Sequence, residues 1–390
     1  MSAIPEFAFD NAASLLNDRD FATVRQLIAD YAGIKLSLQK RNMVYNRLLR
    51  RLRARGLSNF AEYLELVQRE GSNEREAFVN ALTTNLTAFF REPHHFELLH
   101  AHAARHGKRG KPLRCWSSAC STGEEAWSIA MVLREAECPG EVLGTDIDTD
   151  VLATARNGVY RTERTAGLPG ERLRKHFLRG TGTNDGLVSV RPELRGMVRF
   201  GQLNLQSPAW PAIEPFDIIF CRNVVIYFDR DAQKRLLARF ADLLAPGGLL
   251  AVVELAGFPR FLPADAPAEA PGLEERCHIV LDRRHAAHLP HRHADWGTLL
   301  RSTGFTVEGE RVFDIALGPG TQAPSEQDAV RRYASSSLRR IRDAVAAELA
   351  PRDLTALDAL LAPDGPGALS RRNDLGVRTT RMAWTARRAL

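Results

Sequence analysis

The chain has 390 residues, of which 44% are hydrophobic and 26% charged, and its net charge is +6 at pH 7. This composition is typical of a soluble globular protein, and the length allows two or three domains with a large buried core. No apolar run approaches the roughly 20 residues of a membrane span, so we expect no membrane insertion. The N-terminal residues 1–7 lack the basic and apolar regions of a signal peptide.

The sequence contains five cysteines and no C-x-x-C pair. An odd number of cysteines without metal-type spacing favours reduced thiols, and we therefore expect a cytoplasmic protein. The positive net charge would suit nucleic acid, an anionic membrane surface or an acidic protein partner. The position of the basic residues along the chain should decide between these partners.

Residues 1–82 are predicted to form an all-helical N-terminal domain. Ser37 can cap the second helix of this domain, and Asn59 with Glu62 forms a capping-box pattern at the start of the third. Glycines stop the first three helices, because glycine favours the left-handed conformation that follows a helix. The predicted helices cover residues 20–31, 38–55, 60–70 and about 73–82.

The segment 37–56 is predicted to be a basic helix that docks an acceptor. Val44, Leu48 and Leu52 recur at helical spacing and should face the core, which leaves the basic side chains on the outer faces. A solvated surface helix usually carries both signs of charge, whereas this one has no acidic residue. An acidic helix or a phosphate backbone would both suit this surface. Its basic residues are Lys40, Arg41, Arg47, Arg50, Arg51, Arg53 and Arg55.

Residues 81–96 join the helical domain to the rest of the chain, and they are too polar for a core strand and too aromatic for a linker. Asn85 and Thr87 offer hydrogen bonds. Arg91 is a planar double donor that suits a carboxylate, although it could instead pair with Glu92 or with an acid at the surface.

Residues 114–131 pass from a short apolar strand through a run of small residues into an amphipathic helix. The small residues let backbone N–H groups approach a ligand at a helix N-terminus, as in nucleotide sites. The stretch lacks G-x-G-x-x-G, however, and Glu124 and Glu125 would repel a pyrophosphate. A cationic cofactor without phosphates, such as S-adenosylmethionine, fits better. An ordinary strand-to-helix turn whose acids suit the helix dipole explains this stretch alone equally well.

From Leu113 to about residue 255, strand and helix patterns alternate as in a doubly wound α/β domain. Asp146 lies 23 residues after Gly123, where such a fold places an acid against ribose hydroxyls. Residues 158–200 form a predicted insert, with a helix near 171–177 and short strands around 187–190 and 197–200. The other predicted strands are 141–148, 216–221 and 249–254, and a helix is expected at about 230–244.

Four motifs in this part of the chain resemble those of the CheR chemoreceptor methyltransferases, in the same order and with fitting gaps. They are residues 83–92, 121–125, 145–148 and 221–229. These enzymes transfer a methyl group from S-adenosylmethionine to receptor glutamates and release S-adenosylhomocysteine. The resemblance covers about residues 18–255. It implies a Rossmann-like class I methyltransferase with a seven-stranded mixed sheet, an all-α N-terminal domain and a small β-subdomain insert.

The resemblance also implies roles for individual residues. It places Arg91 and Tyr227 beside the reacting methyl group, and it makes the helix at 37–56 the surface that meets the receptor's methylation helices. A glutamate with a reference pKa of about 4.3 is already ionised at neutral pH, so the reaction requires positioning and desolvation and no general base. Tyr227 and Phe228 could instead simply pack under the next helix. Implied cofactor contacts are Asn85, Thr87, Arg91, Glu125, Asp146, Asn204, Leu205, Arg222 and Asn223.

The insert at 158–200 resembles the small β-subdomain that, in some members, docks a tethering peptide at the receptor's C-terminus. Its loop at 179–186 looks like the glycine-bearing form found in tether-binding members. We expect a monomer that binds no nucleic acid, because the positive charge lies on one helix without interleaved aromatics beyond Tyr45.

Residues 256–390 depart from the CheR pattern and resemble the C-terminal part of actinobacterial-type small class I methyltransferases. The resembling segments are 271–276, 295–305 and 374–381. Two strands at 306–317 and 375–387 would close a seven-stranded sheet, so the chain is interpreted as a mosaic with its seam near 250–258. Helices are predicted at 294–302, about 327–349 and 352–361. Histidines 278, 285, 288, 291 and 293 match no standard zinc spacing, and no metal site is predicted.

Three functions agree with these features. The first is methylation of chemoreceptor glutamates, by a helical domain at 1–82, a cofactor-binding core at 83–255 and a tail at 256–390. The second is a methyltransferase whose tail selects another acceptor, a small molecule or a different protein. The third is a module that binds cofactor or receptor without catalysis. The first is favoured, because the cofactor residues and the docking helix belong to the same resemblance.

Overall fold

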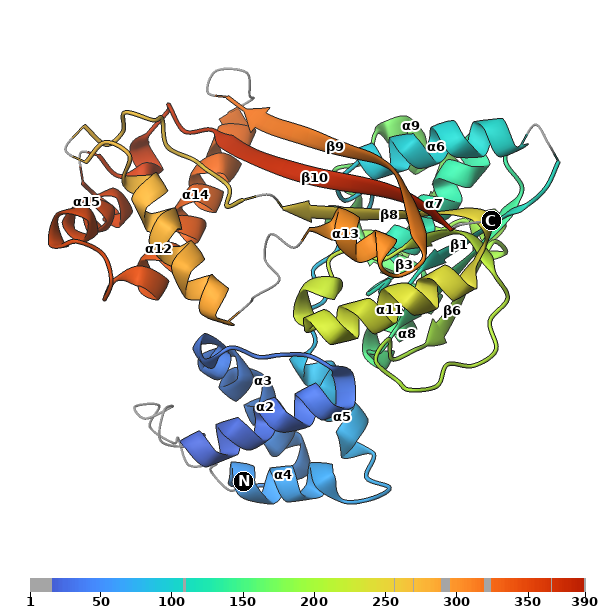
Figure 1. Cartoon of the computed structure of the whole chain (residues 1–390), viewed down its shortest axis with the longest axis horizontal. Coiled ribbons are helices and arrows are strands. Elements are labelled where there is room, and N and C mark those ends of the chain that lie inside the picture. The colour runs from blue at the N-terminus through green and yellow to red at the C-terminus, as the bar shows by residue number, and fades with distance from the viewer. Residues whose placement is uncertain are drawn as a thin grey trace. The chain divides into compact units, whose positions relative to one another are not determined.

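The structure is a computed structural model that describes residues 16–107, 110–255, 257–268, 270–288, 295–318, 324–365 and 367–388. Figure 1 shows its helices and strands, coloured from the N-terminus to the C-terminus. The chain divides into two compact units. The first runs through Ala251 and includes Ser302–Thr306 and the residues from Ala386; the second contains Val252–Arg301 and Val307–Thr385.

In the described residues 16–82, four helices form the N-terminal part of the first unit, as predicted. Each contributes an apolar stripe to one core, which contains Phe21, Leu48, Tyr63 and Phe78 among others. The backbone at Gly33, which follows the first of these helices, is left-handed with φ 69°, as is usual where a helix ends. The helices are α2 (Asp18–Ala32), α3 (Arg41–Arg55), α4 (Phe60–Gln68) and α5 (Glu74–Leu82).

The start of the basic helix differs from the prediction. Residues Leu38–Lys40 form a 3-10 turn before α3, and the Ser37 side chain makes no capping hydrogen bond. The prediction for Ser37 is wrong because the free N–H groups of α3 begin a full turn further along. Asn59 does cap α4, since its Oδ1 accepts a hydrogen bond from the Glu62 backbone N–H at 2.9 Å.

A seven-stranded sheet with the strand order β6-β2-β1-β7-β8-β10-β9 forms the frame of the α/β fold. The pairings from β6 through β8 are parallel. The order of the strands along the chain reverses between β1 and β7, and doubly wound sheets bind ligands beyond the strand ends at such a point. The predicted class I fold is confirmed. The strands are β1 (Leu113–Ser117), β2 (Gly140–Asp146), β6 (Val198–Gln202), β7 (Phe216–Phe220), β8 (Leu244–Leu255), β9 (Phe305–Leu317) and β10 (Val377–Arg388).

Helices cover both faces of this sheet at β1. Cys115 belongs to the same buried cluster as Ile129 of α7 (Glu124–Glu135). The next residue, Trp116, packs against Phe240 of α11 (Arg230–Leu243), with ring centroids 5.4 Å apart. Because successive side chains of a strand point to opposite faces, α7 and α11 lie on opposite sides of the sheet. The first unit also contains α6 (His94–Gly107), α8 (Thr149–Asn157) and α10 (Pro192–Arg195).

The insert is shorter than predicted. Its antiparallel sheet has the order β3-β5-β4 and consists of Val159–Arg161, Leu187–Val190 and Phe177–Arg179, with α9 (Gly170–His176) between β3 and β4. The strand predicted at 197–200 is instead β6, which pairs in parallel with β2 of the main sheet. Its assignment to the insert is wrong because Phe200 packs on Trp127, with ring centroids 5.3 Å apart, in the core of the main domain. The insert sheet therefore ends at Val190.

The second unit packs three helices around a separate apolar core that contains Leu273, Leu338 and Leu357. These helices are α12 (Leu273–His288), α14 (Pro324–Val345) and α15 (Pro351–Leu361), and the short helix α13 (Trp296–Arg301) precedes β9. The predicted helices and strands of the tail are confirmed to within a few residues, whereas α12 was not assigned bounds from the sequence. The buried Glu274 carboxylate accepts backbone N–H groups from Phe261 and Leu262, both at 2.9 Å.

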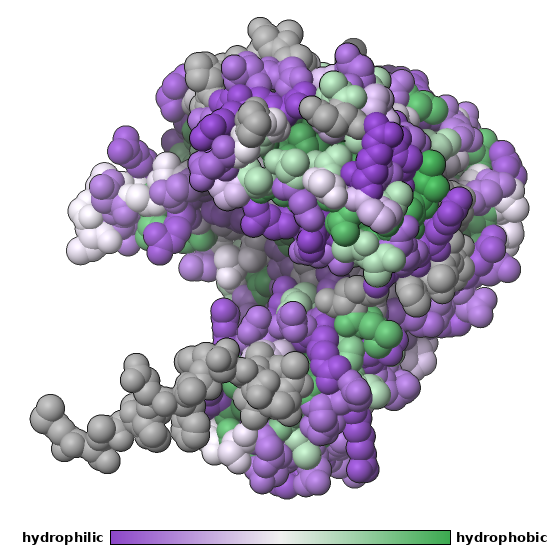
Figure 2. Space-filling view, turned by 90° about the vertical axis from the view of Figure 1, so that its left-hand side faces the viewer, coloured by the Kyte–Doolittle hydropathy of each residue, from purple (hydrophilic) through white to green (hydrophobic). Residues whose placement is uncertain are grey.

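The surface and the histidine-rich segment add little to the predicted functions. No helix in the described ranges combines the length and apolar character that crossing a membrane requires. The face shown in Figure 2 is largely hydrophilic, with hydrophobic residues in small separate groups.

The histidine-rich segment is described only in part. The side chains of His285 and His288 and the whole of His291 and His293 lie outside the described part of the structure. Among the described side chains, no three His, Cys, Asp or Glu residues gather as a metal site would require.

Candidate active site

The loop between β1 and α7 is attached to both neighbouring strands. The Ser118 backbone N–H and its Oγ both donate to the Phe220 carbonyl oxygen, at 2.9 and 3.0 Å. On the other side, the Cys120 backbone N–H donates to the Thr145 carbonyl oxygen at 2.9 Å. Ser118 and Cys120 are each 1% exposed. The loop therefore lies over the ends of β2, β1 and β7, where a doubly wound sheet places its ligand.

Two left-handed residues shape this loop before α7 begins. Ser121 has a φ of 51° and Gly123 a φ of 96°. A Cβ atom at Gly123 would lie 2.8 Å from the Cβ of Ala155 in α8, so glycine is required there both by conformation and by space. The first residues of α7 are Glu124 and Glu125, whose charges suit the positive end of the helix dipole.

Asp146 at the end of β2 lies under the loop. Its Oδ2 accepts the Ser121 backbone N–H at 2.8 Å, and its Oδ1 accepts the Asp148 backbone N–H at 3.1 Å. Burial raises the pKa of Asp146, and these two hydrogen bonds partly oppose the shift. A carboxylate has about four acceptor positions, so Asp146 retains capacity for hydroxyl donors such as those of a ribose.

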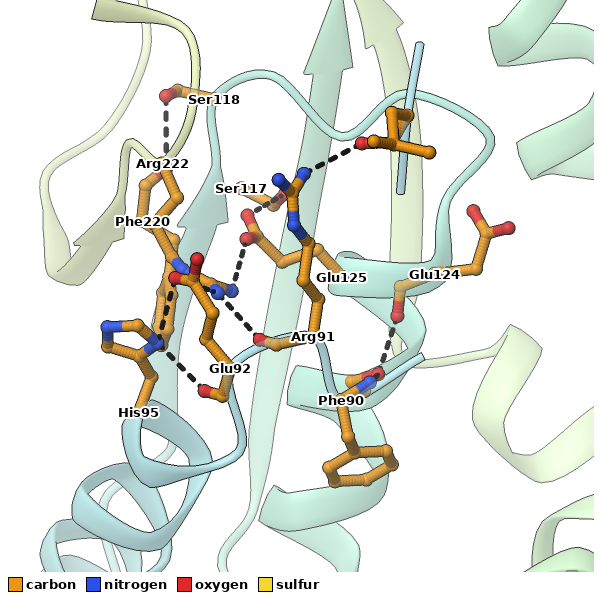
Figure 3. A network of polar contacts seen from close by, with 12 residues as sticks. Phe90, Arg91, Glu92, His95, Ser117, Ser118, Glu124, Glu125, Phe220 and Arg222 are labelled. Atoms are coloured by element: carbon orange, nitrogen blue, oxygen red, sulfur yellow. Dashed lines mark hydrogen bonds and ion pairs between the residues drawn. The ribbon is translucent and has the colours of Figure 1, made fainter. Parts of the chain in front are cut away.

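Arg222 connects three segments of the chain in the network of Figure 3. Its Nη1 lies 2.9 Å from Glu125 Oε2, and its Nη2 lies 3.0 Å from Glu92 Oε2. Nη2 also donates to the Arg91 carbonyl oxygen at 2.6 Å, and Ser117 Oγ donates to Glu125 Oε1 at 2.7 Å. Arg222 is 8% exposed. This arginine is thus a buried bridge between two carboxylates, beside the loop after β1.

Arg91 lies in a strained segment of backbone. Its two neighbours, Phe90 and Glu92, have φ angles of 51° and 56°, and Asn223 in the loop after β7 has a φ of 58°. Non-glycine residues in this conformation cluster at functional sites. Arg91 is half-buried, and its Nη1 donates to the Leu86 carbonyl oxygen at 2.7 Å. Glu92, the alternative partner considered for Arg91, has its Oε2 3.0 Å from Arg222 Nη2.

His95 supports the same segment from α6. Its Nδ1 lies 2.9 Å from the Glu92 carbonyl oxygen, and the residue is 5% exposed. Burial, assisted by the positive charge of Arg222, lowers the pKa of His95 to about 3. The imidazole is therefore neutral at physiological pH. Because a carbonyl oxygen only accepts hydrogen bonds, the proton of the neutral ring resides on Nδ1.

Tyr227 and Phe228 differ in their surroundings. Phe228 is 4% exposed and its carbonyl oxygen accepts a hydrogen bond from Gln233 Nε2 of α11 at 3.2 Å, so it packs under that helix. Tyr227 ends a 3-10 turn, is only half-buried, and its ring makes no aromatic contact within the described chain. The packing alternative thus applies to Phe228, whereas Tyr227 keeps part of its surface exposed.

Several predicted cofactor residues use their side chains within the protein. Asn85 Nδ2 donates to Asp148 Oδ2 at 2.7 Å, and Asn204 Nδ2 donates to the Tyr31 carbonyl oxygen of α2, also at 2.7 Å. Asn85 still borders the loop after β1, since Ser121 Oγ donates to its carbonyl oxygen at 3.3 Å. Asn204 lines a groove together with Tyr31, Glu76, Ile147 and Gln202. Leu205 is buried, and Thr87 is half-buried.

The basic helix α3 exposes fewer arginines than predicted. Arg51 Nε and Nη2 bind the Glu74 carboxylate at 2.8 and 3.0 Å, and Arg55 binds the same carboxylate. Arg47 donates to the Ala81 and Thr83 carbonyl oxygens. Arg41 contacts Asp18 and the Leu16 carbonyl oxygen. The prediction that all seven basic side chains face outward is therefore wrong for Arg41, Arg47 and Arg51, which are half-buried. The exposed members without a side-chain partner in the described chain are Lys40, Arg50 and Arg53.

Glu74 explains this arrangement. Its side chain is 1% exposed, and Tyr63 Oη also donates to it at 3.1 Å. Burial opposes its ionisation, but the hydrogen bonds from Arg51 and Arg55 outweigh burial and lower the pKa of Glu74. A buried carboxylate requires cationic partners, and two arginines of α3 supply them.

Sequence reasoning missed the residues that hold this site together. The sequence suggests Glu92 only as a possible partner of Arg91, and it gives His95 no role. No local signal predicts a positive φ at Phe90 or Glu92, because neither is a residue type that favours it. The capacity of Arg222 to join Glu92 and Glu125 depends on folding, since those acids precede it by 130 and 97 residues.

Comparison with known proteins identifies the family. Two family models match the chain: "CheR methyltransferase, all-alpha domain" over residues 19–83 and "CheR methyltransferase, SAM binding domain" over residues 85–254. The chemotaxis protein methyltransferase of Escherichia coli is 52% identical over 240 residues, which are 60% of this chain and 83% of that protein. The chemotaxis protein methyltransferase of Salmonella typhimurium is 51% identical, over 60% of this chain and 82% of that protein. Chemotaxis protein methyltransferase 2 of Pseudomonas aeruginosa is 48% identical, over 64% of this chain and 90% of that protein. The chain therefore belongs to the CheR family of methyltransferases.

Proposed function

We propose that this CheR-family chain methylates glutamate side chains of chemoreceptors, and that Arg91 and Tyr227 lie beside the methyl group that is transferred. The chain is an S-adenosylmethionine-dependent methyltransferase. The observation that carries the proposal is the network around Arg222, which joins Arg91, Glu92 and Glu125 at the point where the sheet order reverses.

The residues of this region fit S-adenosylmethionine. The loop of small residues leaves backbone close to the ligand position, and Asp146 retains acceptor capacity for ribose hydroxyls. The Glu125 carboxylate, held by Arg222, is the acid proposed to contact the cofactor, whereas Glu124 is fully buried and binds Arg164. When bound, S-adenosylmethionine supplies an electrophilic methyl group on a positively charged sulfonium. The proposed contacts are Asn85, Thr87, Arg91, Glu125, Asp146, Asn204, Leu205, Arg222 and Asn223, with Arg222 acting mainly by holding Glu125.

The chain's own part in the reaction is positioning. Arg91 directs one N–H to the Leu86 carbonyl oxygen, which leaves other N–H donors of the guanidinium for an acceptor carboxylate. The half-buried ring of Tyr227 orients the acceptor or contacts the sulfonium. No base is needed, because the acceptor glutamate is already ionised. The nearby His95 is not placed to act as a base, since it is buried and its Nδ1 lies against the Glu92 carbonyl oxygen.

The proposed acceptor surface consists of Lys40, in the 3-10 turn before α3, and of Arg50 and Arg53 on α3. These side chains are exposed, and an acidic receptor helix would complement their charge. Arg51 and Arg55 instead hold α3 in place by binding Glu74. Arg47 does the same by donating to the carbonyl oxygens of Ala81 and Thr83.

The insert is proposed to dock a receptor tether peptide by adding a strand to its sheet. In the order β3-β5-β4, both β3 and β4 are edge strands, and Leu178 on β4 is 43% exposed. Edge strands recognise extended peptides through backbone hydrogen bonds and a few side-chain contacts. We further propose that the protein acts as a monomer in the cytoplasm, which agrees with five free, buried cysteines.

The tail is proposed to come from actinobacterial-type small class I methyltransferases. The family match ends at residue 254, and the boundary between the two compact units lies at Ala251 and Val252. Both positions fall in the predicted seam at 250–258. We propose domains at 1–82 and 83–255, with a tail at 256–390 that supplies β9 and β10 to the sheet.

The role of Arg91 is tested by kinetics with a soluble receptor fragment. Arg91→Ala should reduce kcat by about a hundredfold while leaving the melting temperature unchanged, because it removes positioning of the acceptor. Arg91→Lys should recover little, because lysine cannot hold a carboxylate with two parallel hydrogen bonds. Unchanged kcat in Arg91→Ala would remove Arg91 from the site, whereas cofactor binding without turnover by the parent chain would favour a chain that binds without catalysis.

A further inference from the structure

We propose that Arg172 of the insert is a positioning residue for methyl transfer, because it fixes the segment Phe89–Arg91 that presents Arg91. The inference rests on the role proposed for Arg91. It gives the insert a part in the architecture of the catalytic site, in addition to any docking of a peptide.

Arg172 lies on α9 and is held in one orientation by Glu135 of α7. Its Nε and Nη2 lie 2.8 and 2.6 Å from the two carboxylate oxygens, and His176 Nε2 lies 2.9 Å from Glu135 Oε1. His176 is fully buried. A bidentate pair of this kind fixes the plane of the guanidinium as well as its position.

The fixed guanidinium covers the ring of Phe90, with its Cζ 4.0 Å from the ring centroid. This distance is within the range of a favourable cation–π contact. The backbone N–H of Phe90 donates to Ser128 Oγ of α7 at 3.0 Å. Phe90 is therefore held by its ring from α9 and by its backbone from α7, immediately before Arg91.

Such restraint is needed because the backbone on both sides of Arg91 is left-handed. Phenylalanine and glutamate do not adopt this conformation unless their surroundings impose it. Arg222 imposes it after Arg91, through the Arg91 carbonyl oxygen and the Glu92 carboxylate. Arg172 acts on the other side, at Phe90.

The preceding residue, Phe89, is also held by the insert. Its ring meets the edges of Tyr160 on β3 and Phe177 on β4, with centroid distances of 5.1 and 5.3 Å. The Tyr160 hydroxyl donates to the Thr122 carbonyl oxygen at 2.7 Å, in the loop before α7. The insert thus contacts both the Arg91 segment and the loop proposed to hold the cofactor, which makes it a brace for the relative placement of the two.

Kinetics of Arg172→Ala and Arg172→Lys test the proposal, with Arg174→Ala as the matched control. Arg174 lies on the same helix with an exposed side chain. The acceptor is a soluble receptor fragment without its C-terminal tether, so that peptide docking does not contribute. Arg172→Ala should lower kcat about tenfold or more and leave KM for the fragment within about twofold of the parent value. Arg174→Ala should have the same kcat and KM as the parent. Lysine should restore part of kcat, because it keeps a cation near Phe90 and loses the bidentate pair.

Amide hydrogen exchange supplies a readout that does not depend on the acceptor. In Arg172→Ala, the peptide that spans residues 84–96 should exchange at least threefold faster, whereas Arg174→Ala should exchange at the parent rate. If the parent chain methylates no receptor fragment, the proposed function fails, and the exchange experiment still decides whether Arg172 restrains this segment.

A double-mutant cycle separates positioning from general loss of folding. Phe90→Leu removes the ring face and keeps an apolar side chain, so it should lower kcat like Arg172→Ala. The double variant should then be no worse than either single variant. Parent-like kcat and exchange in Arg172→Ala, or fully additive losses in the cycle, would overturn the proposal.

Discussion

Arg222 and Glu125 form a buried ion pair in which Nη1 lies 2.9 Å from Oε2, with side chains 5% and 13% exposed. The pair joins the loop after β7 to the first turn of α7. Family resemblance suggests these residues as two separate cofactor contacts, whereas the structure makes them one unit. The position of Glu125 beside the cofactor loop therefore depends on Arg222.

Arg222→Ala should destabilise the protein by about 3 kcal/mol or more, because it leaves the carboxylates of Glu125 and Glu92 buried without their cation. Urea unfolding followed by circular dichroism measures the change. Arg134→Ala on the exposed face of α7 is the control and should stay within about 0.5 kcal/mol of the parent. Equal unfolding midpoints for the two variants would show that the pair does not support the fold.

Stability should fall as the pH drops below about 6.5, because burial and the charge of Arg222 lower the pKa of His95 to about 3. Between these two values the unfolded chain binds a proton that the folded chain does not, so acid favours unfolding by up to about 1.4 kcal/mol per pH unit. His95→Gln removes this titration. Melting temperatures from pH 7 to 5 should decline less steeply in His95→Gln than in the parent, and parallel declines would contradict the assignment.

Glu74→Ala should destabilise the helical domain by about 3 kcal/mol, because the carboxylate is 1% exposed and binds Arg51, Arg55 and Tyr63. Glu70→Ala, at an exposed position near the end of α4, is the matched control and should have little effect. Urea unfolding compares the two. A small loss in Glu74→Ala would mean that the arginines of α3 are not anchored through this residue.

Charge reversal should separate docking arginines from supporting ones. Arg50→Glu with Arg53→Glu should raise KM for a receptor fragment about tenfold at low salt and leave the melting temperature unchanged, and the effect should shrink as salt screens it. Arg51→Ala should instead lower the melting temperature. If all three positions change KM equally at constant stability, the division of α3 into docking and supporting residues is wrong.

The fold could be predicted from the sequence because its elements carry strong local patterns. The four N-terminal helices have regular apolar stripes, and the strands of the main sheet are short, buried apolar runs. The strand at 198–202 shows the limit of local patterns, because they do not tell which sheet the strand joins. Its pairing with β2 depends on Phe200 fitting over Gly144, where a Cβ atom would lie 2.7 Å from the Phe200 ring.

The sequence suggests the individual motif residues of the candidate site, but it does not predict which of them contact one another. Periodicity assigns Val44 and Leu48 to the core face of α3, but it cannot tell that Arg51 meets Glu74, which lies 23 residues further on. The same limit applies to Arg172, whose contact with Phe90 depends on the insert packing against α7. Long-range partners of arginine are set by tertiary structure, because a long side chain with five donors can satisfy many neighbours.

The most direct test of the account is transfer of labelled methyl groups from S-adenosylmethionine to a soluble chemoreceptor fragment. The proposed function predicts label on the fragment as base-labile methyl esters of glutamate, released as methanol at high pH, and an initial rate about a hundredfold lower when Arg91 is replaced by alanine. A base-stable product, label on a small molecule alone, or equal labelling by Arg91→Ala would contradict it.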